Sequence, residues 1–176
     1  MWDIKDGCGV NGMLGPDGQP FLDGLKQKKL RLFWSLSVDW FNPYGNEAAG
    51  KAVSTGSVAM VCLNLPPSLW YKVEDLFLAA VMPKEPSVEE VGNYIKPLVE
   101  MLNKSWKNST KFAQTKSSEH GRMEHSMLAM VVADLPASCK INGAAGHSVR
   151  KFMCMFCGLG QGNMNNLDQA TWPTRG

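Results

Sequence analysis

The chain has 176 residues, 44% of them hydrophobic, and a formal net charge of +2. Its length suits one domain with a buried core, and its modest charge excludes disorder along the whole chain. The near-neutral charge neither requires nor excludes nucleic acid as a partner. No run of residues approaches the ~18 apolar residues of a membrane span. The first ten residues lack the basic region and apolar core of a signal peptide, which predicts an intracellular protein without a membrane segment.

The first part of the chain predicts a turn-rich segment followed by three strands. Five glycines and two prolines fall between Gly7 and Pro20, and this composition predicts a loop with one short hairpin. One or two helical turns are predicted over residues 22–30. Large apolar side chains then recur in three runs that end in turn residues or prolines, which is typical of strands in an antiparallel meander. The three predicted strands are residues 30–38, 57–65 and 76–82.

A helix and a fourth strand are predicted after the meander. Ser87 is a suitable N-cap, and apolar residues follow it at helical spacing. Pro97 should kink or divide this helix because proline lacks an N–H donor. Residues 103–122 are polar and predict a loop, and residues 127–135 predict a buried strand. A three-strand meander, a crossover helix and a parallel fourth strand form a truncated ribonuclease H-like core with a mixed sheet, so the predicted class is α/β.

Two aspartates stand at the ends of predicted strands. Asp39 follows the first strand, and Asp134 lies near the end of the fourth. If these strands are neighbours, the two carboxylates come together and can hold Mg²⁺ or Mn²⁺, which prefer hard oxygen ligands. A pair of such ions can activate water and stabilise the leaving oxygen in phosphodiester cleavage. In the alternative interpretation, Asp39 caps the turn at residues 42–45 and Asp134 caps the segment after Pro136.

The five cysteines include one close pair, Cys154 and Cys157. Without a secretory signal, such a pair indicates a metal or redox site before a structural disulfide. A structural zinc site needs four ligands, and either Cys139 or His147, which lie upstream, could be a further one. A redox pair usually opens a helix after a strand, whereas a glycine follows this pair. Two free buried thiols are the third interpretation.

Basic side chains without nearby acids occur in two segments, residues 103–116 and 140–157. These segments either contact phosphates or form a solvated surface. His120 and His125 are expected in a polar surface loop. Three tryptophans are expected to anchor the core or turns, with base stacking by an exposed one as the alternative. They are Trp40, Trp70 and Trp106.

Five blocks of the sequence are similar to one family of enzymes. In chain order they are SLSVDWFNPYGN, VCLNLPP, LFLAAVMPKEPSVEEVGNYIKPLVEML, VVADLPAS and HSVRKFMCMFC. The family that these blocks resemble is that of the CACTA-type (En/Spm-like) DNA transposases, and the fungal members are the most similar. The resemblance covers about residues 2–175. On this basis the chain divides into an irregular N-terminal segment (1–29), a partial transposase core (30–150), and a cysteine-pair segment with a tail (151–176).

The resemblance implies cut-and-paste transposition of DNA in the nucleus. In this family a ribonuclease H-like core uses three acidic ligands for Mg²⁺ or Mn²⁺, acts on transposon ends and can work as an oligomer. Asp39 and Asp134 match the first two acids. Cys154 and Cys157 match a cysteine pair that implies a Zn²⁺ site completed by later residues.

The third acid of the family follows the cysteine pair. Asp168 is the only acid after that pair, and its block does not resemble the third-acid block. We therefore expect a fragment of the enzyme that is inactive alone. Two alternatives stay open at this stage: a non-catalytic remnant that binds nucleic acid or protein, and a zinc-stabilised protein of unrelated role.

Overall fold

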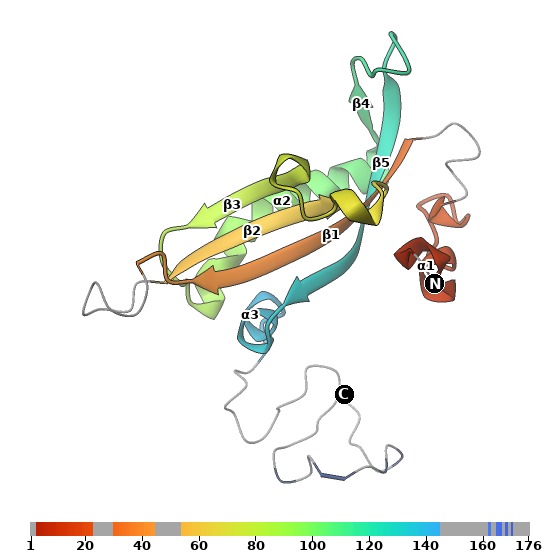
Figure 1. Ribbon diagram of the computed structural model, residues 1–176. Coiled ribbons are helices and arrows are strands. Elements are labelled where there is room, and N and C mark those ends of the chain that lie inside the picture. Colours follow the sequence, from red (N-terminus) through yellow and green to blue (C-terminus); the bar gives the residue numbers. More distant parts are fainter. Residues whose placement is uncertain are drawn as a thin grey trace. The chain divides into compact units, whose positions relative to one another are not determined.

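The computed structural model describes residues 3–22, 30–44 and 54–144, together with isolated positions 162, 165, 166, 168 and 170. Short helical turns precede the sheet and interrupt it (Figure 1). They are η1 (Ile4–Asp6), α1 (Cys8–Asn11), η3 (Pro67–Leu69) and η4 (Val73–Asp75). The main elements are β1 (Leu30–Phe41), β2 (Thr55–Cys62), β3 (Leu76–Met82), α2 (Val88–Asn108), β4 (Thr110–Phe112), β5 (Arg122–Ala133) and α3 (Leu135–Ile141).

The five strands form one mixed sheet in the order β3-β2-β1-β5-β4. In Figure 1 the arrowheads of β1 and β5 point the same way and that of β2 points the opposite way. This arrangement confirms the predicted α/β class, with a helix connecting the meander to a strand beside β1. The short strand β4 pairs antiparallel with the start of β5 and falls in residues 103–122, so the loop predicted there is wrong in part. The ribonuclease H-like assignment stays a prediction.

The predicted second strand ends earlier than expected because a side chain replaces the backbone. Beyond the end of β2, the N–H of Leu63 donates to the carbonyl oxygen of Phe33 at 2.7 Å. The side chain of Asn64 then accepts from the Phe33 N–H at 2.8 Å and donates to the Arg31 carbonyl oxygen at 3.0 Å. Asn64 thus satisfies the β1 backbone groups that a longer β2 would have paired.

Helix α2 is a single element that continues through Pro97, so Pro97 does not divide the helix, and a kink there stays a prediction. Ser87 and Glu90 form a reciprocal capping box, in which the Ser87 Oγ accepts from the Glu90 N–H at 3.2 Å and the Glu90 carboxylate accepts from the Ser87 N–H at 3.0 Å. The predicted N-cap is therefore confirmed. The helix also runs past residue 103, where a loop was predicted, because Ser105 is buried and Trp106 is half-buried.

The chain separates into two compact units, each assembled from three stretches of sequence. Unit 1 comprises Met1–Ser37, Val58–Ala80 and Lys96–Val131, and unit 2 comprises Val38–Ser57, Val81–Ile95 and Val132–Gly176.

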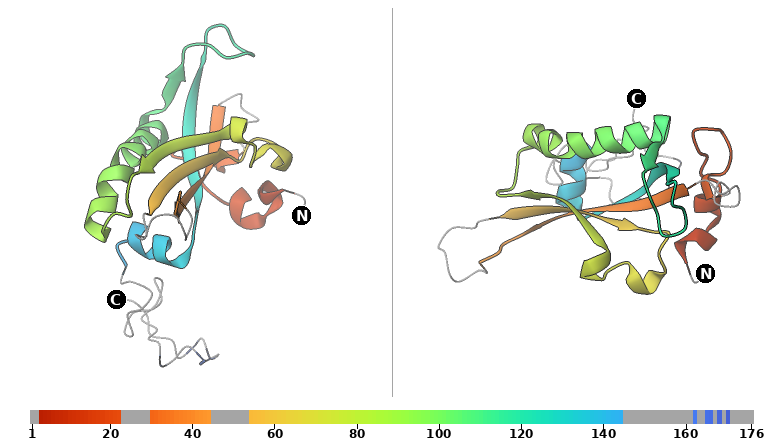
Figure 2. Two further views of the ribbon diagram at one scale, coloured as in Figure 1. Left: turned by 60° about the vertical axis from the view of Figure 1, so that its left-hand side comes forward. Right: turned by 90° about the horizontal axis from the view of Figure 1, so that it is seen from above.

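In unit 1 the second half of α2 lies on the sheet (Figure 2). Phe21 from the N-terminal segment packs on Phe33 of β1, with ring centroids 6.2 Å apart, and stacks on Trp106 of α2 at 5.8 Å. Val61 and Leu63 complete this buried cluster. The N-terminal segment, predicted as loop, therefore contributes to the core.

Two charged side chains are buried in unit 1, Arg31 and Glu124, and Arg31 is paired with a carboxylate. Arg31 in β1 is 1% exposed, and its Nη2 donates to a carboxylate oxygen of Asp17 at 2.6 Å. Its guanidinium carbon lies 5.0 Å from the centroid of the Phe21 ring. Asp17 occupies the tight turn closed by the Leu14–Pro20 bridge, which corresponds to the predicted short hairpin. The ion pair thus attaches this turn to the first strand.

The core of unit 2 forms around Trp40 near the end of β1. A β-carbon built at Gly56 in β2 would lie 1.9 Å from the Trp40 ring and 2.9 Å from the Met82 methyl group. The Trp40 indole therefore lies directly on the backbone of β2, and only glycine leaves room for it. Val91 of α2 and Cys139 of α3 are also buried in this unit.

Candidate functional site

Asp39 lies near the end of β1 with its side chain exposed between buried Val38 and half-buried Trp40. Its carboxylate accepts a hydrogen bond from the Trp40 N–H at 2.9 Å. In the turn that follows, the side chain of Asn42 accepts from the Tyr44 N–H at 3.0 Å. Asn42 thus caps the described part of this turn, and the alternative role suggested for Asp39 stays a prediction.

Asp134 follows β5 directly and is the N-cap of α3. Its Oδ1 accepts from the Ala137 N–H at 2.8 Å, and Pro136 occupies an early helical position that needs no N–H donor. The capping role given as the alternative is therefore confirmed. The cap engages only one oxygen of an exposed carboxylate, so the other oxygen can still accept a ligand.

The cap of α3 leads to a prediction on stability. Replacing Asp134 by alanine should lower the free energy of unfolding by about 1 kcal/mol, because the N–H of Ala137 loses its acceptor. Replacing Asp134 by asparagine should lower the free energy of unfolding by only about 0.3 kcal/mol, because asparagine caps helices as well as aspartate does. Urea denaturation monitored by circular dichroism measures both changes. Equal destabilisation by the two variants would contradict the capping role.

The sheet places Asp39 and Asp134 at the ends of neighbouring strands. β1 and β5 are adjacent, both residues belong to unit 2, and both side chains are exposed. Neither carboxylate forms an ion pair with the described part of the chain, so no lysine or arginine of that part competes with an added ion. Across residues 3–22, 30–44 and 54–144 no group of three or more histidine, cysteine, aspartate or glutamate side chains is arranged to hold a metal ion. Any metal site built on these two acids needs further ligands.

Lys140 links the two parts of the chain that carry these aspartates. It lies in α3, the helix that Asp134 caps, and its ammonium group is 5.5 Å from the Trp40 ring centroid. The same ammonium bonds the Glu85 carboxylate and the Pro86 carbonyl oxygen, the latter at 3.3 Å. Because Trp40 is the neighbour of Asp39, Lys140 restrains α3 against the end of β1. In the sequence, Lys140 stands out only as a basic residue of segment 140–157, and its contact with Trp40 could not be predicted.

The three cysteines that the structure describes are free thiols in different surroundings. Cys8 is exposed and Cys139 is buried in α3. Cys62 is half-buried, and this burial raises the pKa of its thiol above the ordinary value. Cys154 and Cys157, and His147 with them, lie outside the described residues, so the zinc site stays a prediction.

His125 and the tryptophans Trp40, Trp70 and Trp106 have structural roles. His125 lies in β5 and is half-buried, with Nδ1 3.1 Å from the carbonyl oxygens of both Ser105 and Trp106, so its predicted place in a surface loop is wrong; His120 is exposed in a turn as expected. The indole N–H of Trp70 donates to the Leu65 carbonyl oxygen at 2.7 Å. With the packing of Trp40 and Trp106 described above, this confirms the tryptophans as anchors.

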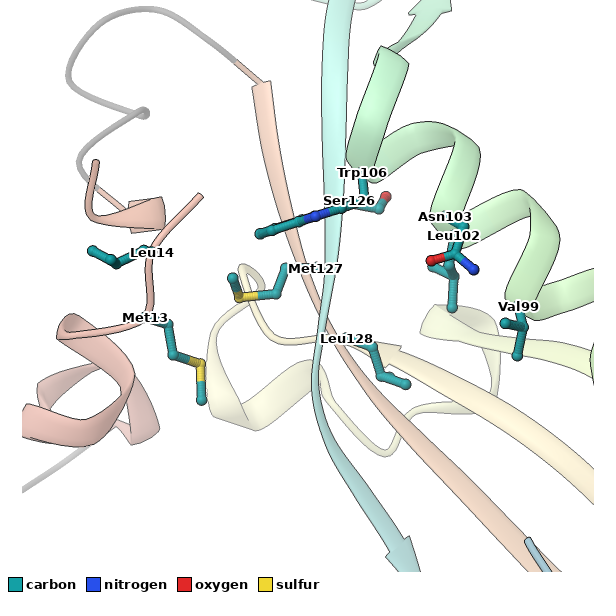
Figure 3. Close-up of a pocket in the computed structure, with 9 residues that line it drawn as sticks. All are labelled: Met13, Leu14, Val99, Leu102, Asn103, Trp106, Ser126, Met127 and Leu128. Carbon is teal, nitrogen blue, oxygen red and sulfur yellow. The ribbon is translucent and has the colours of Figure 1, made fainter. Parts of the chain in front are cut away.

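A hollow of about 480 Å³ in unit 1 is unsuited to phosphate chemistry. In Figure 3 the side chains of Met13 and Met127 point toward one another, and Leu128 lies on the side of α2. No acidic or basic side chain of the described residues lines the hollow. Its lining residues are Met13, Leu14, Val99, Leu102, Asn103, Trp106, Ser126, Met127 and Leu128.

Comparison with protein families decides the relationship that the five sequence blocks suggested. The family described as "Transposase family tnp2" matches residues 23–170. The chain belongs to this transposase family. The expected relationship to transposases is thereby confirmed at the level of the tnp2 family, and it implies DNA as the partner in general.

No curated protein matches this tnp2-family chain. Among its described residues, no helix is long and apolar enough to cross a membrane. The finer resemblance to CACTA-type and fungal transposases, and the nuclear location that it implies, stay predictions.

Proposed function

We propose that this tnp2-family chain is part of a transposase that cuts DNA strands and joins them to a target, with Asp39 and Asp134 as two of its divalent-metal ligands. The observation that carries the proposal is the position of two exposed carboxylates at the ends of adjacent strands within one compact unit. Family membership supplies the class of substrate.

The donor chemistry of the two aspartates fits Mg²⁺ or Mn²⁺. Carboxylate oxygens are the ligands that these hard cations prefer, and each side chain is exposed. When bound, such ions neutralise charge on the phosphate and generate a nucleophile from water. The residues themselves supply the negative charge and its placement: Asp134 is fixed by its capping bond and Asp39 by β1. Two carboxylates by themselves should hold such an ion weakly, and further oxygen ligands would strengthen its binding.

Metal binding to the whole chain tests the proposed ligands. At a Mn²⁺ concentration about ten times the dissociation constant, the wild-type melting temperature should rise by about 3–6 °C, because the ion binds only the folded state. Asp39→Asn and Asp134→Asn should each abolish most of this rise. The asparagine at position 134 keeps the cap of α3, so its effect reports the lost charge. Glu119→Gln, which removes an exposed carboxylate from the turn between β4 and β5, is the matched control and should behave like wild type.

Equal melting temperatures with and without Mn²⁺ would contradict the metal site, as would a rise in melting temperature that persists in both asparagine variants.

A second candidate function, DNA binding without catalysis, is supported by four exposed lysines in α2 and around β4. They are Lys104, Lys107, Lys111 and Lys116. None of these lysines forms a salt bridge with the described residues, so they are available to phosphates. DNA affinity that falls steeply with salt and is unchanged by the asparagine variants would identify a non-catalytic DNA-binding protein.

A further inference from the structure

A buried carboxylate in unit 1 has no role in the proposed reaction. Glu124 in β5 is 4% exposed. One of its oxygens accepts from the Ser105 hydroxyl at 2.7 Å, and the other accepts from the Ser126 hydroxyl at 2.9 Å. These bonds connect β5 to the last turns of α2.

The surrounding donors determine the direction of these hydrogen bonds. The Ser126 Oγ accepts from the indole N–H of Trp34 at 3.1 Å, and the Ser105 Oγ accepts from the Ser126 N–H at 2.8 Å. A hydroxyl has one proton to donate, and in each serine that proton is directed at Glu124. Both oxygens of Glu124 are therefore acceptors, as they are in a carboxylate anion.

No cation compensates this anion within the described residues. No lysine, arginine or histidine there forms a salt bridge with Glu124, and the Nδ1 of neighbouring His125 is directed at backbone carbonyl oxygens. An ionised group removed from water is costly unless it is paired. The two serine hydroxyls supply hydrogen bonds but no opposite charge. A cation placed beside the Glu124 carboxylate would therefore be stabilised by this buried negative charge.

An apolar cavity of about 440 Å³ adjoins Glu124. Its volume falls within the range of small-molecule sites, which combine an apolar lining with a few buried polar groups. The three residues of the hydrogen-bond network, Glu124, Ser105 and Ser126, all line this cavity. Aromatic rings and methionines that suit an organic cation form much of the rest. They are Trp34, Phe77, Phe112, Met60 and Met101.

We propose that this cavity binds a small hydrophobic ammonium ion, with the ammonium group paired to Glu124 and the apolar part between the aromatic rings. The cavity volume favours a small molecule. This site lies wholly in unit 1 and is independent of the aspartates of unit 2, so it stands or falls separately from the proposed transposase function.

Calorimetric titration with 2-phenylethylammonium, in a buffer without amines, tests the site against its neutral analogue 2-phenylethanol. We expect the ammonium ion to bind at least about tenfold more tightly than the alcohol, because a hydrogen bond to a charged group is stronger than one between neutral groups. In Glu124→Gln the affinity for the ammonium ion should fall to that for the alcohol, while the affinity for the alcohol should be unchanged.

A second variant places the cation within the chain itself. Thr110 of β4 lies directly opposite Glu124 in the register, lines the cavity and is exposed at the surface. β-carbons of such cross-strand partners are about 5 Å apart, so the ammonium group of Thr110→Lys can reach Glu124. This variant should bind no added ammonium ion and should melt at a higher temperature than Thr110→Met, which has a similar length without the charge.

Two results would overturn the proposal. The first is equal affinity of the wild type for the ammonium ion and the alcohol, which would show an apolar cavity without charge selection. The second is absence of binding by the wild type together with equal melting of Thr110→Lys and Thr110→Met. That result would show that Glu124 does not respond to a cation, even one held beside it by the chain.

Discussion

Replacing Gly56 by alanine should destabilise the protein by about 2–3 kcal/mol, the cost of inserting a methyl group into a filled core. The added carbon would lie 1.9 Å and 2.3 Å from two carbons of the Trp40 ring and 2.9 Å from the Met82 methyl group. Both partners belong to unit 2. The Met82 methyl ends a flexible side chain, whereas the Trp40 ring cannot yield without moving the end of β1. Urea denaturation measures the loss of stability.

The same substitution should weaken the proposed metal site. Asp39 is the residue before Trp40, so a displaced ring moves the backbone that carries the carboxylate. We expect the Mn²⁺-induced rise in melting temperature to shrink in Gly56→Ala. Gly92→Ala is the matched control, because a β-carbon at Gly92 in α2 has no atom within 4 Å, and alanine there should stabilise the helix by about 0.5–1 kcal/mol. A Gly56→Ala protein as stable as wild type would show that Trp40 is free to move off β2.

Replacing Asp17 by alanine should cost about 3 kcal/mol. The Arg31 side chain is 2% exposed and the Asp17 side chain 33% exposed, so the substitution leaves a buried guanidinium without its carboxylate. Removal of one partner from a buried pair is far more costly than removal from a surface pair. Thermal denaturation of the variant should show this loss, together with detachment of the N-terminal turn from β1.

Two further variants separate the buried charge from the simple loss of a contact. Arg31→Met removes the charge and keeps much of the side-chain volume, so it should cost less than Asp17→Ala, and the double variant should resemble Arg31→Met alone. Glu100→Ala breaks a surface ion pair, in which the Glu100 side chain is 66% exposed and the Lys96 side chain 72% exposed. This substitution should change stability by less than about 0.5 kcal/mol. Equal effects of Asp17→Ala and Glu100→Ala would contradict the account of Arg31.

The sequence predicted the elements that have a strong local pattern. β1 and β3 are apolar runs that end in turn residues or proline, and the start of α2 has the capping serine with glutamate three residues later. β4 has no such pattern, because three residues are too few to show alternation. The last turns of α2 look polar from the lysines at 104 and 107, although Ser105 and Trp106 between them face the interior.

The candidate sites likewise contain residues that the sequence predicts and residues that it does not. Asp39 and Asp134 could be chosen because each follows an apolar strand, and the cap at Asp134 could be anticipated from Pro136. The contact between Lys140 and Trp40 joins residues far apart in the chain, and no local spacing predicts it. Glu124 was not found because the alternation of polar and apolar residues at the start of β5 suggests that its polar face is solvated. In the structure that face is buried.

The interleaving of the two compact units has a consequence for synthesis on the ribosome. Each unit is assembled from three separate stretches, and the last stretch of unit 2 begins only at residue 132. A nascent chain can thus gather all of unit 1 while unit 2 still lacks α3. On the proposed function, the carboxylate of Asp39 then has no partner, so ion binding and any DNA cleavage that depends on it must wait until translation has passed Asp134.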